Sequence, residues 1–273
     1  MSFWLLFFGV LAGVTTVLFG FGGGFVMVPV LYALLLAQHG ADSVVGQAAM
    51  HIAVATSTAV MVYGAGLATW RHHQRGHLRW TGLRLLLVFI GLGALAGAAL
   101  AQAVSGAWVR WAFIVYLALA IADTLLRPGF MAQKAGSQRP LSKTLAAGAG
   151  LLIGAIAAFL GVGGSVLSVP LMRRRGASMT TATAMASPLS LPMAVVGCAT
   201  YMLLASHAKP ERLSHLSGWS IGYVDVQAAL LLMLGSWLGI QLATPWMGRI
   251  PDAVHARAYV GLLCLVLALL LVL

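Results

Sequence analysis

Two glycine-rich stretches are the places where this sequence could bind a ligand through its backbone. The first reads GFGGGFVMVPVL over residues 20–31, and the second reads GVGGSVLSVPLM over residues 161–172. Glycine has no Cβ, so its backbone can approach a ligand closely and adopt a positive φ. A helix that begins after such a break presents free N–H groups and the positive end of its dipole, and both favour an anion. The chemistry expected here is backbone binding of a small anion.

The two stretches correspond to each other at a constant offset of 141 positions. The matched residues are Gly20, Gly22, Gly23 and Pro29 with Gly161, Gly163, Gly164 and Pro170, while Ser165 stands in place of Gly24. The halves match again in AVATSTAV and TAMASPLS, where Thr56-Ser57 corresponds to Ala186-Ser187. Glycines of this kind can also serve only tight helix packing. Because each copy is followed by Val-Pro at the same distance, we favour a paired binding site.

The composition places these stretches in a membrane protein. Of the 273 residues, 61% are hydrophobic and only 8% are charged, whereas a soluble domain carries roughly a quarter charged residues. No Lys or Arg precedes Arg71, so the first apolar segment does not read as a cleavable signal peptide. The net charge of +11 is explained by orientation, because basic residues collect in cytoplasmic loops. Nucleic acid is therefore not an expected partner.

Eight apolar segments are candidates for membrane crossing, which needs about 20 residues each. They lie at roughly 3–37, 44–69, 80–103, 107–127, 143–172, 178–206, 223–247 and 254–273. The first and fifth are too long for one straight span, and both contain the glycine cluster. The sequence predicts an all-α polytopic membrane protein of two four-segment repeats, at 1–127 and 143–273, joined by a cytoplasmic linker at 128–142. Close helix packing is predicted at Gly93, Gly97, Gly235 and Gly239, which form Gly-x-x-x-Gly pairs.

The basic residues distinguish two arrangements of the repeats. Eight straight crossings would leave ten of the 16 Lys and Arg residues on the cytoplasmic side. If the first and fifth segments instead break at the glycines and return to the side they entered, the second half is inverted. Only Arg110, Lys209 and Arg212 then remain outside, which follows the positive-inside rule better. This arrangement predicts inverted repeats with both termini in the periplasm.

The doubled glycine–proline motif, with the AVATS and MASPLS segments, resembles the TauE/SafE sulfite exporter family, also called the toluene sulfonate uptake permease family. The resemblance covers about residues 5–272. It implies a bacterial inner-membrane secondary transporter, favoured as an exporter, for sulfite or organosulfonates such as sulfoacetate. The substrate-binding residues it implies are Gly22, Gly23, Gly24, Thr56, Ser57, Gly163, Gly164, Ser165 and Ser187. The departures from the family pattern are Ser165, Ala186 and Pro188.

Two ionisable residues inside apolar segments are candidates for coupling transport to protons. His51 stands a helical turn or so before Thr56 and could carry a proton or counter the charge of the anion. The alternative for His51 is a neutral histidine that bridges two helices. Asp123 stands four residues before Arg127, which is the spacing of a helical ion pair, and its alternative is a proton relay.

Other functions stay open at this stage. An anion channel, or a carrier of another small carboxylate or oxoanion, would use the same helix starts. Residues 218–222, GWSIG, satisfy the G-x-S-x-G pattern of serine hydrolases, but that pattern needs a strand-to-helix turn and we expect no strand here. The run RRR at 173–175 is interpreted as an orientation signal, with attraction of anions as the alternative. No metal or organic cofactor is implied, the expected partners are the lipid bilayer and a small anion, and homo-oligomerisation is left open.

Overall fold

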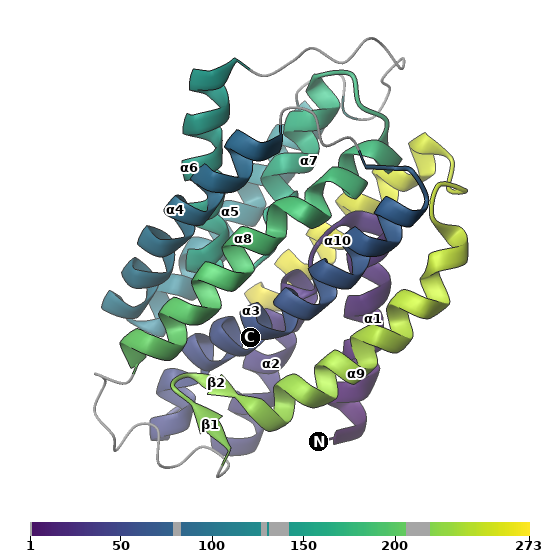
Figure 1. The fold of residues 1–273 in the computed structure, drawn as a ribbon. Helices are drawn as coiled ribbons and strands as arrows, with labels where there is room; N and C mark the ends of the chain where they lie inside the picture. Colours follow the sequence, from purple (N-terminus) through teal and green to yellow (C-terminus); the bar gives the residue numbers. More distant parts are fainter. Residues whose placement is uncertain (1, 79–82, 127–129, 131–141, 206–218) are drawn as a thin grey trace.

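The protein is described here by a computed structural model that covers residues 2–78, 83–126, 130, 142–205 and 219–273. Within these residues the chain is almost entirely helical (Figure 1). The first half contains α1 (Ser2–Phe19), α2 (Gly24–His39), α3 (Val44–Gln74), α4 (Leu83–Ala103) and α5 (Gly106–Leu126). The second half contains α6 (Lys143–Leu160), α7 (Ser165–Arg174), α8 (Met179–Ala205), β1 (Ser220–Ile221), β2 (Val224–Asp225), α9 (Val226–Ala243), the 3₁₀ turn η2 (Thr244–Trp246) and α10 (Asp252–Val272).

Eight of the described helices are long and apolar enough to cross a membrane. The exceptions are α2, with 16 residues, and α7, with 10. Large apolar side chains such as Leu92, Leu119 and Leu265 are exposed on α4, α5 and α10, as expected of helix faces in contact with lipid. The prediction of an all-α polytopic membrane protein is confirmed.

The two predicted helix breaks are both present. Residues 20–23 separate α1 from α2, and residues 161–164 separate α6 from α7. Pro29 and Pro170 each lie inside the shorter helix that follows the break. Each is the sixth residue of its helix, beyond the first four residues whose N–H groups have no helical partner. Each proline therefore removes one hydrogen bond from its helix, which favours a kink there.

Backbone dihedral angles explain the glycines only in part. Gly20, Gly22 and Gly23 have φ values of 73°, 67° and 93°, which residues with a side chain rarely adopt. In the second break Gly161 has a φ of 67°, whereas Gly164 has a φ of −63°. The expectation of positive φ is therefore correct for Gly23 and wrong for its counterpart Gly164, because the chain enters α7 through helical dihedral angles.

The Gly-x-x-x-Gly pairs permit two very close helix contacts. A Cβ placed on Gly93 would lie 2.1 Å from the carbonyl oxygen of Leu151 on α6. A Cβ placed on Gly239 would lie 2.0 Å from the carbonyl oxygen of Val10 on α1. The other glycines of the pattern in close backbone contact are Gly97 and Gly235. Their predicted packing role is confirmed.

These contacts interlock the two halves of the chain. Helix α1, which precedes the first break, packs against α9 of the second half (Figure 1). In the same way α6, which precedes the second break, packs against α4 of the first half. Both α9 and α4 follow the long central helix of their own half. The central helices α3 and α8 also contact each other. Figure 1 shows α1 and α2 in the lower part of the molecule and α6 and α7 in the upper part. Inverted repeats would produce this arrangement, and the repeat boundaries stay a prediction; most of the linker at 128–142 lies outside the described residues.

Candidate functional site

The two glycine breaks meet in the core of the bundle. A Cβ placed on Gly24 would lie 2.3 Å from the carbonyl oxygen of Gly161. One placed on Gly163 would lie 2.5 Å from the carbonyl oxygen of Phe21. All four residues are buried. The fold therefore brings into direct contact the two stretches that the sequence pairs.

Helices α2 and α7 both begin at this contact. Their N-cap residues are Gly23 and Gly164, and neither makes a side-chain capping hydrogen bond. The first N–H groups of a helix have no partner within that helix, and its dipole adds partial positive charge at the same end. Two helix starts at one buried place produce a positive potential that suits an anion.

The hydroxyl groups around the breaks differ between the halves. Ser57 on α3 donates to the carbonyl oxygens of Val54, at 2.9 Å, and Gly161, at 3.1 Å. Its counterpart on α8, Ser187, is fully buried, and its Oγ has no hydrogen-bond partner within the described part of the chain. The same holds for Ser165, the first residue of α7. Ser165 and Ser187 thus belong to a set of four buried second-half serines whose hydroxyls have no partner among the described residues, the other two being Ser168 and Ser236.

Thr56 has a structural partner. Its Oγ1 accepts a hydrogen bond from the backbone N–H of Asp225 at 3.0 Å, where β2 leads into α9. The Asp225 carboxylate in turn caps α9 by accepting from the N–H of Ala228 at 2.9 Å. Thr56 therefore connects α3 to the start of α9, and this bond uses only its oxygen as an acceptor, so the hydroxyl hydrogen could still be donated to an anion.

Met61 occupies the space beside the first break. A Cβ on Gly22 would lie 2.8 Å from Met61 Cγ, and one on Gly24 would lie 2.4 Å from Met61 Cε. Met61 is fully buried on α3. Methionine is unbranched and adapts its shape easily, so this side chain can move more readily than the backbone around it. The sequence contains no pattern that singles out Met61, because its position depends on how α3 crosses the break.

His51 bridges two elements of the first half. Its Nε2 lies 3.0 Å from the carbonyl oxygen of Ala101 and 3.1 Å from that of Val104. A carbonyl oxygen only accepts, so Nε2 carries the hydrogen. The ring also lies 5.6 Å from that of Tyr223. These contacts fit the bridging interpretation of His51, while a coupling role stays a prediction.

Asp123 forms an ion pair between elements. The carboxylate of Asp123 on α5 contacts the guanidinium of Arg174 on α7. Its predicted partner Arg127 lies outside the described residues. Asp123 therefore holds α5 to α7, and its proton-relay alternative stays untested.

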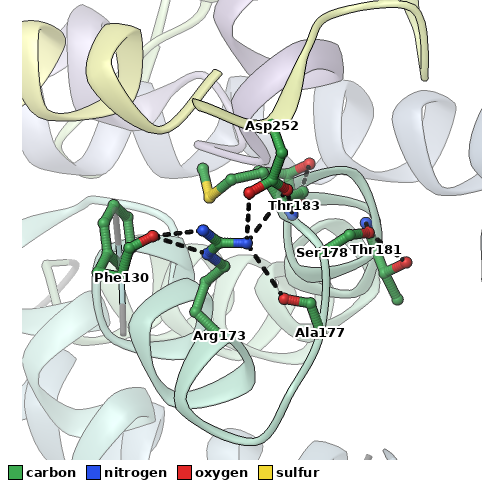
Figure 2. Close-up of polar contacts among 8 residues, drawn as sticks. Phe130, Arg173, Ala177, Ser178, Thr181, Thr183 and Asp252 are labelled. Carbon is green, nitrogen blue, oxygen red and sulfur yellow. Dashed lines mark hydrogen bonds and ion pairs between the residues drawn. The ribbon is translucent and has the colours of Figure 1, made fainter. Parts of the chain in front are cut away.

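The arginine run contains a buried ion pair that sequence reasoning missed (Figure 2). Arg173 is completely buried and lies 2.8 Å from a carboxylate oxygen of Asp252, the first residue of α10. Arg173 also donates to the carbonyl oxygens of Phe130 and Ala177, and Asp252 accepts from the N–H of Met179 at 2.7 Å. Arg173 is thus a buried structural residue, and the interpretation of the run as an orientation signal stays a prediction. Its spacing could have shown its burial, because it lies four residues after buried Val169 on the same helical face.

The G-x-S-x-G pattern does not form a nucleophile elbow. Contrary to expectation, a strand is present, but Ser220 lies within β1 and pairs with Asp225 of β2 across a tight turn. A nucleophile elbow instead places the serine between a strand and a helix. His215 and Gly218 lie outside the described residues. The hydrolase alternative therefore loses the geometry on which it depended.

Eight membrane-length helices, with two more that begin at a shared glycine contact, define a polytopic helical membrane protein of the broken-helix type. The chain belongs to the Sulfite exporter TauE/SafE family, whose family model matches residues 5–271. It is also similar to a "Probable membrane transporter protein" of Haemophilus influenzae (strain ATCC 51907 / DSM 11121 / KW20 / Rd), with 26% identity over 261 residues, 93% of this chain and 92% of that protein. No solved structure matches the chain. The predicted family is confirmed, and with it the class of membrane transporter.

Proposed function

We propose that this protein is a secondary transporter that exports small sulfur-containing anions, sulfite or organosulfonates such as sulfoacetate, across the bacterial inner membrane. Membership of the sulfite exporter family supports the substrate class. The inside-negative potential supports export, because it drives anions outward by about 2.3 kcal/mol per charge at 100 mV.

The observation that carries this proposal is the meeting of two helix starts, one of which begins with the unpaired hydroxyl of Ser165. Helices α2 and α7 begin at the contact between the glycine breaks. Ser165 and Ser187 are fully buried, and their hydroxyls are unpaired among the described residues. An unsatisfied buried hydroxyl costs about 1–3 kcal/mol, and the oxygen atoms of an anion would remove that cost by accepting from both. The bound anion would lie between the breaks, with Gly22, Gly23, Gly24, Gly163 and Gly164 providing backbone close to it.

Binding at this place requires a local opening. Gly24 and Gly163 contact the opposite break so closely that no side-chain atom would fit, and Met61 lies over Gly22 and Gly24. An anion would displace the flexible Met61 side chain and separate the breaks. Broken helices at the interface of repeats are where transporters of this general design bind their substrates.

Counterflow across liposome membranes tests the proposal. Radiolabelled sulfoacetate should enter liposomes preloaded with unlabelled sulfoacetate faster than empty ones, and the exchange should saturate. A channel would show no such stimulation by internal substrate. Loss of both saturation and stimulation, for sulfite and for sulfoacetate alike, would remove the proposed carrier function.

Two matched serine variants locate the site. Ser187→Ala should raise the half-saturating concentration about tenfold or more, since a hydrogen bond to a charged group is worth about 1.5–3 kcal/mol. Its stability should stay near that of the unmodified protein, because no bond to a described residue is lost. Ser57→Ala should instead lower stability by about 1 kcal/mol through loss of its bond to Gly161. Unchanged saturation in Ser187→Ala would place the anion elsewhere.

A further inference from the structure

A second candidate site lies away from the glycine breaks, in a cavity of about 470 Å³. Its walls come from the later part of α2, the start of α3, the connection between α4 and α5, and the turn before α9. The cavity therefore lies toward the end of the molecule where α2 and the β-hairpin are seen (Figure 1). The polar residues that matter most are Tyr32, Gln47, His51, Gln102, Arg110 and Tyr223. None of the glycines of the breaks belongs to this lining.

The charge of the cavity is carried by Arg110. None of the acidic residues that the structure describes lines the cavity, so its walls contain no carboxylate to neutralise this guanidinium. Arg110 Nη2 donates to the carbonyl oxygen of Leu270 near the end of α10, at 3.2 Å. Its Nε is buried and has no hydrogen-bond partner in the described ranges. The guanidinium is thus held in place by one bond while other N–H donors remain available, and such a group binds oxoanions well.

Two helix starts reinforce this positive potential. Val44, Gly46 and Gln47 from the first turn of α3 line the cavity, as do Gly106 and Ala107 from the first turn of α5. Partial positive charge collects at both starts. Arg110 lies one turn into α5, so its charge adds to that of the helix start.

The size and the walls of the cavity indicate what could bind there. A volume of about 470 Å³ is within the range of sites for small organic ligands, and it exceeds what sulfite alone would fill. Leu36 and Trp111 add apolar surface to the lining. The cavity can therefore hold a sulfonate head against Arg110 together with a short carbon tail, or a smaller anion with part of its water shell.

We propose that this cavity is an anion vestibule, in which Arg110 and the starts of α3 and α5 hold an organosulfonate or sulfite between the solvent and the central site. The proposal rests on the proposed function for the identity of the anion. His51 shapes one wall by bonding to the backbone at Ala101 and Val104.

Charge-selective labelling tests the vestibule without measuring transport. Cys198 and Cys264 would first be replaced by alanine, and Ser105→Cys would place one thiol in the cavity lining, at an exposed position. A negatively charged methanethiosulfonate should react with it faster than a positively charged one, relative to the exposed control Ser2→Cys. Adding Arg110→Gln should reduce this preference about tenfold, while Arg110→Lys should preserve it. The same rate ratio in the Gln and Lys variants would overturn the proposal.

Protection by methanesulfonate tests binding directly. Methanesulfonate, which does not attack the reagent as sulfite would, should slow labelling of Ser105→Cys, and Arg110→Gln should raise its half-protecting concentration about tenfold. Exposed Arg257 on α10 offers a matched control, because Arg257→Gln should leave protection unchanged. Protection that is absent, or that does not depend on Arg110, would overturn the vestibule.

Counterflow separates the two proposals. If sulfoacetate exchange is normal in Arg110→Gln and protection is independent of Arg110, the vestibule fails and the carrier function stands. If the unmodified protein exchanges neither sulfite nor sulfoacetate while protection still depends on Arg110, the carrier function fails and an anion site at the cavity stands.

Discussion

The regions at the ends of α2 and α7, the helices that follow the two breaks, differ between the two halves of the chain. In the first half, the end of α2, the start of α3 and the α4–α5 connection enclose an open cavity lined by Tyr32. In the second half, the end of α7, the start of α8 and the start of α10 are closed around Arg173 and Asp252 (Figure 2). Arg173 stands 141 residues after Tyr32, the offset that relates the two glycine breaks. Tyr32 thus lines a cavity, whereas Arg173 at the equivalent position of the second half is buried in an ion pair.

This difference makes the two ends of the molecule structurally unlike each other. One end has Arg110, which forms no ion pair with a described residue, in an open cavity, and the other has the buried Arg173, which is paired with a carboxylate. A carrier exposes its site to one side of the membrane at a time, and the proposed function requires such an asymmetric state.

The first prediction assigns the two ends to the two sides of the membrane. If the open cavity faces the periplasm, as the distribution of Lys and Arg predicts, alkaline phosphatase fused after Leu273 should be active and a green fluorescent protein fusion there should be dark. Fusions within the linker at 128–142 provide the matched control and should give the reverse pattern. An inactive phosphatase at the C-terminus would reverse the assignment of the two ends and contradict the predicted periplasmic C-terminus.

The second prediction concerns the closed end. Asp252→Asn should reduce the free energy of unfolding by about 3 kcal/mol, because it leaves the Arg173 charge buried without its partner. We expect the lower end of the range for buried pairs, since the Asp252 side chain is 39% exposed. Arg110→Gln at the open end should cost less than about 1 kcal/mol, because it removes one hydrogen bond. Denaturant titration of the purified variants measures the contrast.

A double variant sharpens the same contrast. Replacing both partners, Arg173→Met with Asp252→Leu, should recover most of the stability lost in Asp252→Asn, because apolar groups of similar volume leave no buried charge. If Asp252→Asn were as stable as the unmodified protein, the ion pair would not be what holds the second half closed.

The sequence predicts the membrane spans and the helix breaks better than it predicts the contacts between them. Spans and breaks were predictable because apolar length and glycine clusters act locally. The close packing at Gly93 was predictable because small residues four apart have one common use in membrane helices. The helix ends differ from the predicted segments by only a few residues, apart from the two breaks.

The interior of the site could not be predicted in the same way. Arg173 finds its partners 43 and 79 residues away, at Phe130 and Asp252, and nothing local to the arginine run reveals them. Met61 covers the first break only because α3 crosses it there. Thr56 accepts a hydrogen bond from Asp225 across 169 positions, and its predicted role in anion binding stays a prediction. Such contacts depend on how distant helices pack.

The third prediction separates backbone strain from crowding at the first break. Gly23 has a φ of 93°, while a Cβ placed on it would meet Met27 and Thr16 only at 3.4 Å. Gly23→Ala should therefore cost about 1–3 kcal/mol, the penalty of a side chain on a residue in a sparsely populated backbone conformation. Gly148 on α6 has open space around it, so Gly148→Ala should leave stability unchanged or raise it by up to about 1 kcal/mol. Equal stability of the two variants would show that the first break tolerates a side chain.

The last prediction has the smallest expected effect and tests whether His51 is a wall of the open cavity or a proton carrier. Its Nε2–H donates to the carbonyl oxygens of Ala101 and Val104, and the amide of a glutamine can also donate to a carbonyl. His51→Gln should therefore lower stability by less than about 1 kcal/mol and leave the pH dependence of sulfoacetate counterflow unchanged. His51→Ala, which removes the donor, should cost more and serves as the control that the bonds matter. A pH–rate curve that becomes flat in His51→Gln while folding is intact would instead assign the coupling proton to this ring, because glutamine cannot titrate.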